Sequence, residues 1–274
     1  MLNNFLLINK PSGWTSFDVV AYVRKMARKQ NQGIATSADA NRLPRNDKIK
    51  VGHAGTLDPF ATGLLIVGVG REATKRLDEF KNLPKTYVAT IKLGSVSDTF
   101  DKTGTIIIPL KKGGIRGLFA KIFTNNPPHP PLPRGVIERV LKKFIGKIKQ
   151  MPPMYSAKKI NGQKLYNLAR KGITVKRKKN KIQIYNLKLL DYNYPTLKIE
   201  VECSAGTYIR TLANDIGKKL GCGAYCEELE RTKIGEYKLA DAKTPDNCHS
   251  ELAFDLSSRR KVSGSFGMLK PVCR

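Results

Sequence analysis

Residues 51–63 read Val51-Gly52-His53-Ala54-Gly55-Thr56-Leu57-Asp58-Pro59-Phe60-Ala61-Thr62-Gly63. Three glycines in this stretch allow backbone conformations that are closed to other residues, and they let the backbone approach a ligand closely. His53 and Asp58 lie between these glycines. A lone Asp-Pro pair is typical of an ordinary turn, and a lone histidine is more often a hydrogen-bonded structural residue. The stretch therefore predicts a loop of defined conformation. Whether His53 and Asp58 form a functional site depends on the other residues that lie near them in the fold.

The residues around this loop predict an α+β protein. A capping box at residues 15–18 opens a helix that continues to about residue 28. The further elements predicted by periodicity are a strand at 64–69, a helix at 72–80, a strand at 87–93, a helix at 137–145, strands at 182–192 and 197–203, and a helix at 209–220. Because strands and helices mingle without a regular βαβ period, we expect a mixed or mostly antiparallel sheet flanked by helices and loops.

Two stretches lack such a pattern. Residues 29–50 are polar and aperiodic, which indicates a surface insertion, and residues 109–134 form a loop rich in glycine and proline. We expect one domain over residues 1–240 and a short tail over residues 241–274.

Positive charge dominates the composition. The 274 residues include 50 lysines and arginines against 22 aspartates and glutamates, a formal net charge of +28. Such a cationic field attracts nucleic acid or an anionic membrane. No apolar run approaches the roughly 20 residues that span a bilayer, and the N-terminus lacks the pattern of a secretory signal. We therefore expect a cytoplasmic protein that binds nucleic acid and has no membrane partner.

The charge is concentrated between Glu138 and Asp191, where sixteen lysines or arginines occur without one acidic residue. An isolated basic run is usually a solvated face. This run, however, is interleaved with aromatic residues that include Tyr155, Tyr166 and Tyr185. Cations follow phosphates and aromatic rings stack on unpaired bases, so the pattern favours RNA binding over a solvated face.

Five cysteines, odd in number and unevenly placed, indicate reduced thiols rather than a disulfide framework. Cys222, Cys226, Cys248 and His249 can be drawn as a zinc site, but their spacing matches no common zinc motif. Buried small hydrophobic side chains are the favoured interpretation of the cysteines. With no nucleotide-binding loop in the sequence either, we expect no metal and no cofactor.

Several blocks follow one another in the order of a known family. They are Lys10-Pro11-Ser12-Gly13-Trp14-Thr15-Ser16, residues 52–63, Lys85-Thr86-Tyr87, residues 94–104, residues 152–159, Gly206-Thr207-Tyr208-Ile209-Arg210-Thr211-Leu212 and Leu229-Glu230-Arg231-Thr232. Together they resemble the motifs of the TruB-type tRNA pseudouridine synthases, over about residues 5–240. Ser97, where threonine is usual, and Glu230, where arginine is frequent, depart from that pattern.

The resemblance implies a pseudouridine synthase fold and the isomerisation of uridine to pseudouridine at position 55, in the T loop of tRNA. The reaction cleaves a glycosidic bond, rotates the base and reattaches it through C5, so it needs no cofactor. By this resemblance Asp58 is the catalytic carboxylate, as nucleophile or as base, and both roles stay open. Arg210 would keep the carboxylate ionised and in position.

The resemblance also places residues around the reacting nucleotide. Tyr87 and Tyr208 match tyrosines that pack on the extruded base and line the pocket. His53 matches a residue that displaces or stacks near the flipped nucleotide, and Leu229 one at the pocket wall. Taken singly, the tyrosines would more often be core residues.

A basic thumb over about residues 144–180 is the RNA-binding part that the resemblance implies. Lys158, Lys159 and Arg170 match its RNA-contacting cations. Many bacterial members of the family carry a C-terminal PUA domain, for which residues 241–274 are too short and irregular, so we expect no complete PUA domain. We expect a tRNA partner, no obligate protein partner and a monomer.

Two alternatives stay open. A guide-RNA-dependent synthase of the dyskerin type shares the catalytic block, but such enzymes depend on a PUA domain and protein partners. A non-enzymatic basic tRNA-binding protein or chaperone would tolerate the loss of Asp58, whereas the enzyme would not.

Overall fold

A mixed sheet is the frame of the computed structural model, which describes residues 4–33, 49–108, 132–156, 158–160, 162–173, 175 and 177–248. Most of the predicted insertion at 29–50, most of the loop at 109–134 and most of the tail at 241–274 lie outside these residues. The strands of the main sheet are β1 (Phe5–Lys10), β2 (Val51–His53), β3 (Thr62–Val69), β4 (Lys85–Leu93), β7 (Gly146–Gln150), β10 (Asn180–Asn193), β11 (Thr196–Cys203), β12 (Ala224–Ile234) and β13 (Tyr237–Lys238).

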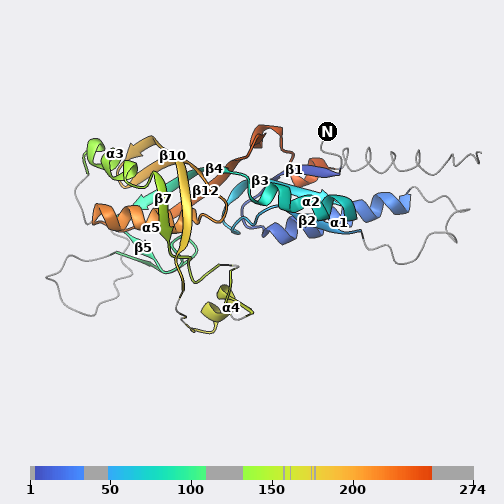
Figure 1. Cartoon of the computed structure of the whole chain (residues 1–274), viewed down its shortest axis with the longest axis horizontal. Coiled ribbons are helices and arrows are strands. Elements are labelled where there is room, and N and C mark those ends of the chain that lie inside the picture. The colour runs from blue at the N-terminus through green and yellow to red at the C-terminus, as the bar shows by residue number, and fades with distance from the viewer. Residues whose placement is uncertain are drawn as a thin grey trace, which may run out of the picture.

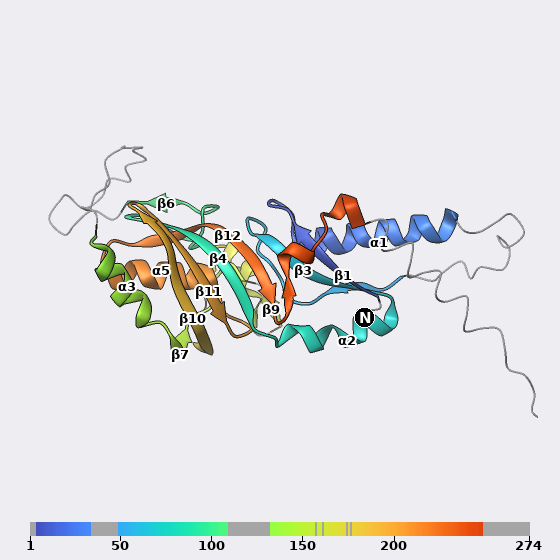
Figure 2. The same cartoon turned by 90° about the horizontal axis from the view of Figure 1, so that it is seen from above.

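The strands lie in the order β1-β3-β12-β4-β11-β10-β7, with β2 paired to β3 and β13 to β12 (Figures 1 and 2). Neighbours pair antiparallel, except that β12 runs parallel to β3 where Glu230 lies opposite Thr62 and Arg231 opposite Gly63. The α+β class with a mixed, mostly antiparallel sheet is confirmed. The late strand β12 joins an N-terminal group of strands to a C-terminal group.

Five helices flank the sheet in the described residues: α1 (Ser16–Gly33), α2 (Arg71–Lys81), α3 (Arg134–Lys142), α4 (Leu165–Arg170) and α5 (Ile209–Leu220). Leu65 and Val67 of β3 pack in one core cluster with α1, whereas Leu64 and Ile66 pack in another with α2. Alternate side chains of a strand point to opposite faces, so α1 and α2 cover opposite faces of β3. This double burial explains the unbroken apolar run from which the strand was predicted.

The largest core cluster lies in the other half of the sheet. Side chains of β4, β10, β11 and β12 pack there with α3 and α5. In β11 the residues predicted to share one face, Leu197, Ile199, Val201 and Cys203, are all buried. Cys203, Cys222 and Cys226 are free and buried, as the interpretation of small hydrophobic side chains predicted.

The local signals for helix ends agree with the structure at two helices. Asp18 Oδ2 accepts a hydrogen bond from the Thr15 amide at 2.7 Å, and Thr15 Oγ1 accepts one from the Asp18 amide at 3.1 Å, which makes the predicted capping box. Gly221 ends α5 with a φ of 78°, in the left-handed region that favours glycine. The helix predicted at 137–145 instead ends at Lys142.

A small substructure lies between β7 and β10, where the thumb was predicted. It consists of the hairpin β8 (Lys159–Ile160) and β9 (Gln163–Lys164) followed by α4, and it projects away from the sheet (Figure 1). A second hairpin, β5 (Val96–Ser97) with β6 (Ile106–Ile107), lies beside the sheet. The short 3-10 helices η1 (Leu239–Asp241) and η2 (Pro245–Cys248) follow β13. Over the described ranges, no helix is long and apolar enough to cross a membrane.

Candidate active site

The loop between β2 and β3 carries Asp58, and the N-terminal motif at residues 10–16 holds this loop in place. Ser16 Oγ accepts a hydrogen bond from the Leu57 amide at 2.8 Å. The Pro59 carbonyl accepts hydrogen bonds from the Gly13 amide at 2.8 Å and from Lys10 Nζ at 3.3 Å. The residues on both sides of Asp58 are therefore fixed to the chain's N-terminal segment. This contact explains why two motifs far apart in the sequence belong to one site.

Arg231 of β12 anchors the two ends of the same loop. Its Nη2 donates to the Gly55 carbonyl at 3.1 Å, and its Nε donates to the Leu64 carbonyl at 2.8 Å. Gly63 has a φ of 106° and lies so close to β12 that a Cβ there would clash with backbone atoms of Arg231. The buried Arg231 guanidinium thus joins the loop to the centre of the sheet, and the absence of a side chain at Gly63 permits the close approach.

Arg210, at the start of α5, forms an ion pair with Asp58. Its Nη2 donates a hydrogen bond to Asp58 Oδ1 at 2.9 Å. Its Nε lies 2.8 Å from Asp58 Oδ2, the second contact of the ion pair. The Arg210 side chain is only 4% exposed, whereas that of Asp58 keeps 32% of its surface exposed. Asp58 is therefore a carboxylate held from the protein side and open to solvent on the other.

Two further groups hold the Arg210 guanidinium. Nη1 donates to Asp101 Oδ2 at 2.9 Å and to the Thr99 carbonyl at 3.1 Å. Asp101 is itself buried, and its Oδ1 accepts hydrogen bonds from the hydroxyl of Thr99 and from the amide of Thr103. Asp101 is thus a second carboxylate that fixes the arginine of the site.

Asp101 was not among the residues predicted to belong to the site. It lies within the block at 94–104 that resembles the family, but its own role was not inferred. The available signal was the alternation of Ser97, Thr99 and Asp101, because an acidic residue buried among hydroxyl groups requires a cationic partner.

The base of the predicted thumb also reaches Arg210. The Tyr155 carbonyl accepts a hydrogen bond from Nη2 at 2.9 Å. Three residues earlier, the Pro152 carbonyl accepts one at 2.8 Å from Arg177, in the segment that leads into β10. One side chain therefore contacts the loop of Asp58, the segment around Asp101 and the thumb base.

Burial raises the pKa of the Asp58 carboxyl above its ordinary value. The charge of Arg210 opposes this rise, the negative charge of Asp101 adds to it, and Lys10 opposes it again. Burial also lowers the pKa of the Lys10 ammonium to about 8, while Asp58 acts in the opposite direction. The protonation of Asp58 thus depends on three charged neighbours that the fold fixes in position.

The aromatic and apolar residues predicted for the pocket lie on the strands and helix that surround the loop. Tyr87 of β4 and Leu229 of β12 are buried in the same core cluster as Leu57 of the loop. Burial raises the pKa of the Tyr87 hydroxyl. Tyr208 is half-buried, and its backbone amide and carbonyl pair with the side chain of Gln150 at 2.8 and 3.0 Å. Gln150 therefore fixes the backbone just before Arg210.

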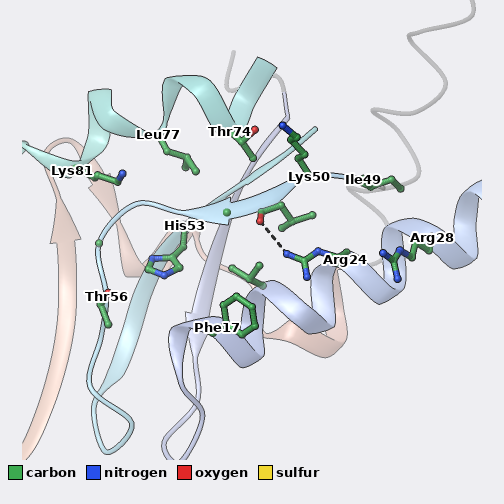
Figure 3. Close-up of a pocket in the computed structure, with 14 residues that line it drawn as sticks. Phe17, Arg24, Arg28, Ile49, Lys50, His53, Thr56, Thr74, Leu77 and Lys81 are labelled. Atoms are coloured by element: carbon green, nitrogen blue, oxygen red, sulfur yellow. Dashed lines mark hydrogen bonds between the residues drawn. The ribbon is translucent and has the colours of Figure 1, made fainter. Parts of the chain in front are cut away.

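His53 ends β2, and its side chain lines a pocket between α1, β2 and α2 (Figure 3). Burial lowers the pKa of its imidazole, and the cations Arg231 and Lys81 lower it further. A neutral imidazole follows near neutral pH, which suits contact with a base better than an ion pair with phosphate.

The predicted thumb residues lie outside the Asp58–Arg210 network. Lys158 Nζ donates to the Asn180 side chain at 2.6 Å, which ties the hairpin to β10. Arg170 ends α4, is exposed and lies with its guanidinium 5.5 Å from the centre of the Tyr166 ring. Lys159 begins β8, and its side chain lies outside the described residues. The zinc site drawn from the cysteines involves His249, which also lies outside them; within the described ranges no group of three or more possible metal ligands gathers.

Comparison with known proteins identifies the family. The model of the TruB family pseudouridylate synthase N-terminal domain matches residues 43–209. The model of the tRNA pseudouridylate synthase B C-terminal domain matches residues 210–255. Curated relatives called tRNA pseudouridine synthase B include one from Parabacteroides distasonis, 46% identical over 88% of this chain and 89% of its own. One from Protochlamydia amoebophila is 42% identical over 91% of this chain and 80% of its own.

A solved structure has the same fold. The crystal structure of a Cbf5–Nop10–Gar1 complex contains a chain that is 25% identical, with a TM-score of 0.60. The match covers 94% of this chain and 57% of that longer chain, so the present protein spans little more than half of it. The expected pseudouridine synthase fold is confirmed. On the family models and the relatives together, the chain belongs to the TruB family of pseudouridylate synthases.

Proposed function

We propose that this protein isomerises uridine to pseudouridine in the T loop of tRNA, at position 55, with Asp58 as its catalytic carboxylate. The names of the relatives support a tRNA substrate. The observation that carries the proposal is the Asp58–Arg210 ion pair, in which a buried guanidinium holds a carboxylate that is about one third exposed. The guanidinium favours the charged form of this carboxylate and fixes its position, and the exposed part of the carboxylate stays accessible, as a nucleophile or a base must be.

The reaction rearranges one nucleoside without gain or loss of electrons. The N1–C1′ bond breaks, the uracil ring turns, and a C5–C1′ bond forms. The proton on C5 then leaves, and N1 carries a proton in the product. Asp58 attacks the ring or sugar, or it removes a sugar proton, and the part of its carboxylate that Arg210 leaves exposed is available for either role. No external reductant, oxidant or energy source enters this balance.

Extrusion of the base places it among aromatic and apolar side chains. A uridine inside a folded loop reaches Asp58 only when it leaves the base stack, at a cost of a few kcal/mol. Tyr87 and Tyr208 offset part of this cost by contact with the uracil, and Leu229 closes the wall beside it. His53, neutral by its lowered pKa, contacts the neighbouring nucleotides.

Substrate affinity comes from the thumb and from its basic flank, the rest of the acid-free run between Glu138 and Asp191. Lys158, Lys159 and Arg170 contact the sugar-phosphate backbone in this proposal. The contact of Arg210 with the Tyr155 carbonyl connects that RNA-gripping segment to the catalytic ion pair. We further propose that the protein acts as a monomer in the cytoplasm, without an obligate protein partner or cofactor.

An unmodified tRNA transcript incubated with the protein alone tests the proposal. The wild-type protein should form pseudouridine at position 55 of the tRNA, and Asp58→Asn should abolish it while tRNA binding stays within a few-fold. Asp191→Asn is the matched control, because Asp191 is exposed on β10 and the same atoms change. Wild-type turnover by Asp58→Asn would exclude Asp58 as the catalytic group. Binding without any modification by the wild type would favour a non-enzymatic tRNA-binding protein.

A further inference from the structure

A pocket of about 900 Å³ opens between α1, β2 and α2, beyond the Asp58–Arg210 pair. Figure 3 shows its side chains converging from the two helices and the strand. The lining consists of Phe17, Val20, Arg24, Arg28, Ile49, Lys50, Val51, Gly52, His53, Gly55, Thr56, Thr74, Leu77 and Lys81. The thumb and its basic flank do not contribute to it.

The lining contains four cations, from both helices and the strand end, and no carboxylate. Lys81 is paired with Asp78 at 2.5 Å. Arg24 donates weakly to the Val51 carbonyl at 3.4 Å. Arg28 and Lys50 are exposed and form no ion pair with any described residue. Arg28 and Lys50, exposed and without a described counter-charge, favour an anionic ligand.

An aromatic ring at the pocket edge narrows the class of anion. Phe17, in the first turn of α1, is 64% exposed. The Arg24 guanidinium lies 6.0 Å from the centre of this ring. A flat apolar face beside cations accepts a base or a sugar together with a phosphate, which is the pattern of nucleic-acid binding.

The pocket begins at the catalytic loop and extends away from it. Thr56 and His53 line its inner end, and Ser16 at the start of α1 is hydrogen-bonded to Leu57. Arg28 lies twelve residues further along α1. At 1.5 Å per residue, it is about 18 Å from the end of the helix that touches the loop. The cations therefore reach RNA well removed from the nucleotide at Asp58.

We propose that this pocket binds the sugar-phosphate backbone of a part of the tRNA outside the hairpin that contains the target uridine. The proposal rests on the proposed function, because the substrate is taken to be a tRNA. The thumb holds the hairpin on one side of Asp58, and the pocket holds a second segment on the other. Recognition of the folded tRNA, rather than of the hairpin alone, is the result.

The proposal is tested by measuring the affinity of one double variant for full-length tRNA and for the isolated T-arm hairpin. Arg28→Gln with Lys50→Gln should bind full-length tRNA about ten-fold more weakly, while the isolated T-arm hairpin binds as tightly as to the wild type. The slope of log affinity against log salt for tRNA should fall by about 1.4 to 1.8, since each lost phosphate contact removes about 0.7 to 0.9. Phe17→Ala should weaken tRNA binding by a few-fold without a change in this slope.

Lys198→Gln with Lys238→Gln is the matched control, because it removes the same charge from exposed positions on β11 and β13, outside the basic run between Glu138 and Asp191. Equal affinities and slopes for the control and the pocket variant would overturn the proposal. So would an equal loss on the hairpin, because the cations would then contact the target arm itself. Failure of the wild type to form pseudouridine would refute the proposed function instead, and the binding comparison would still decide about the pocket.

Discussion

Arg210 donates from Nη2 to Oδ1 of Asp58 at 2.9 Å, across 152 residues of sequence. The same nitrogen donates to the Tyr155 carbonyl, and the other terminal nitrogen donates to Asp101. The planar fork of a guanidinium serves these acceptors from two separate nitrogens at fixed angles, which the single nitrogen of a lysine cannot reproduce. The geometry of the pair is therefore sensitive to substitutions that keep the charge.

Arg210→Lys should lower the single-turnover rate of pseudouridine formation by at least ten-fold. The ammonium keeps the positive charge but loses the contacts with Asp101 or Tyr155, so Asp58 is no longer held in one position. Unsatisfied buried acceptors should also lower the free energy of unfolding by roughly 1–3 kcal/mol, measured in urea. Arg139→Lys, at an exposed site on α3, is the control. A rate equal to that of the wild type would show that charge alone suffices.

The acid side of the pH-rate profile should report on Asp58. Because burial raises the pKa of this carboxyl, the wild-type rate should fall as pH decreases through a value above the ordinary 3.8 of aspartate. Asp101→Asn removes a negative charge that raises the pKa of Asp58, so the acid limb should move to lower pH. Single-turnover rates at saturating tRNA measure both. A shift to higher pH in Asp101→Asn would contradict the assigned charges.

Gly63→Ala should destabilise the protein and impair catalysis together. The new Cβ meets the backbone of Arg231 at a φ of 106°, and the cost exceeds the roughly 1–3 kcal/mol of the left-handed conformation alone. Gly146→Ala is a close control, because Gly146 has a φ of 105° and no atom within 4 Å of the added Cβ. Urea unfolding of both variants isolates the contact with β12. Equal losses in the two would contradict a close approach at Gly63.

Lys10 should make stability depend on alkaline pH. Burial lowers the pKa of its ammonium from 10.5 to about 8, so the folded state disfavours the charged form. The resulting penalty is fully present below pH 8 and is relieved as pH rises towards 10.5. The unfolding free energy of the wild type, minus that of Lys10→Met, should therefore increase between pH 8 and pH 10. A constant difference over this range would show that the lysine titrates normally.

The thumb flank should contribute to the salt dependence of tRNA binding. Lys178 and Lys179 are exposed in the segment that returns to β10. Replacing both with glutamine should reduce the slope of log affinity against log salt by about 1.4 to 1.8 if both contact phosphates. The effect should appear on the T-arm hairpin as well as on full tRNA. An unchanged slope would identify this run as a solvated face.

Elements with strong local signals could be predicted from the sequence, and β12 could not. Its residues alternate poorly, because β-bulges between Cys226 and Glu228 and between Arg231 and Lys233 interrupt the period of two. The strand also carries several charged side chains at the centre of the sheet. Of these, Arg231 is buried because it serves the backbone carbonyls of the catalytic loop, a contact that no local pattern contains.

The residues of the site also divide into those that the sequence predicts and those that it does not. The motif resemblance predicts that the Arg210 guanidinium lies near Asp58, and the structure contains this contact. Asp101 was missed as a member of the site, because a buried carboxylate looks like a turn residue until its cation is known. The pocket beside α1 was not predicted, since its cations come from three separate elements and form no run in the sequence.

The central place of β12 has a consequence for the order in which the protein can assemble. β3 and β4 are made early, but they are joined through a strand that begins at Ala224 (Figure 2). Until that strand leaves the ribosome, β4 lacks its neighbour and presents an open edge, which is a template for pairing with other chains. A product truncated before residue 224 would therefore lack catalytic activity and tend to aggregate, and the vulnerable interval of synthesis runs from the completion of β4 at Leu93 to the completion of β12 at Ile234.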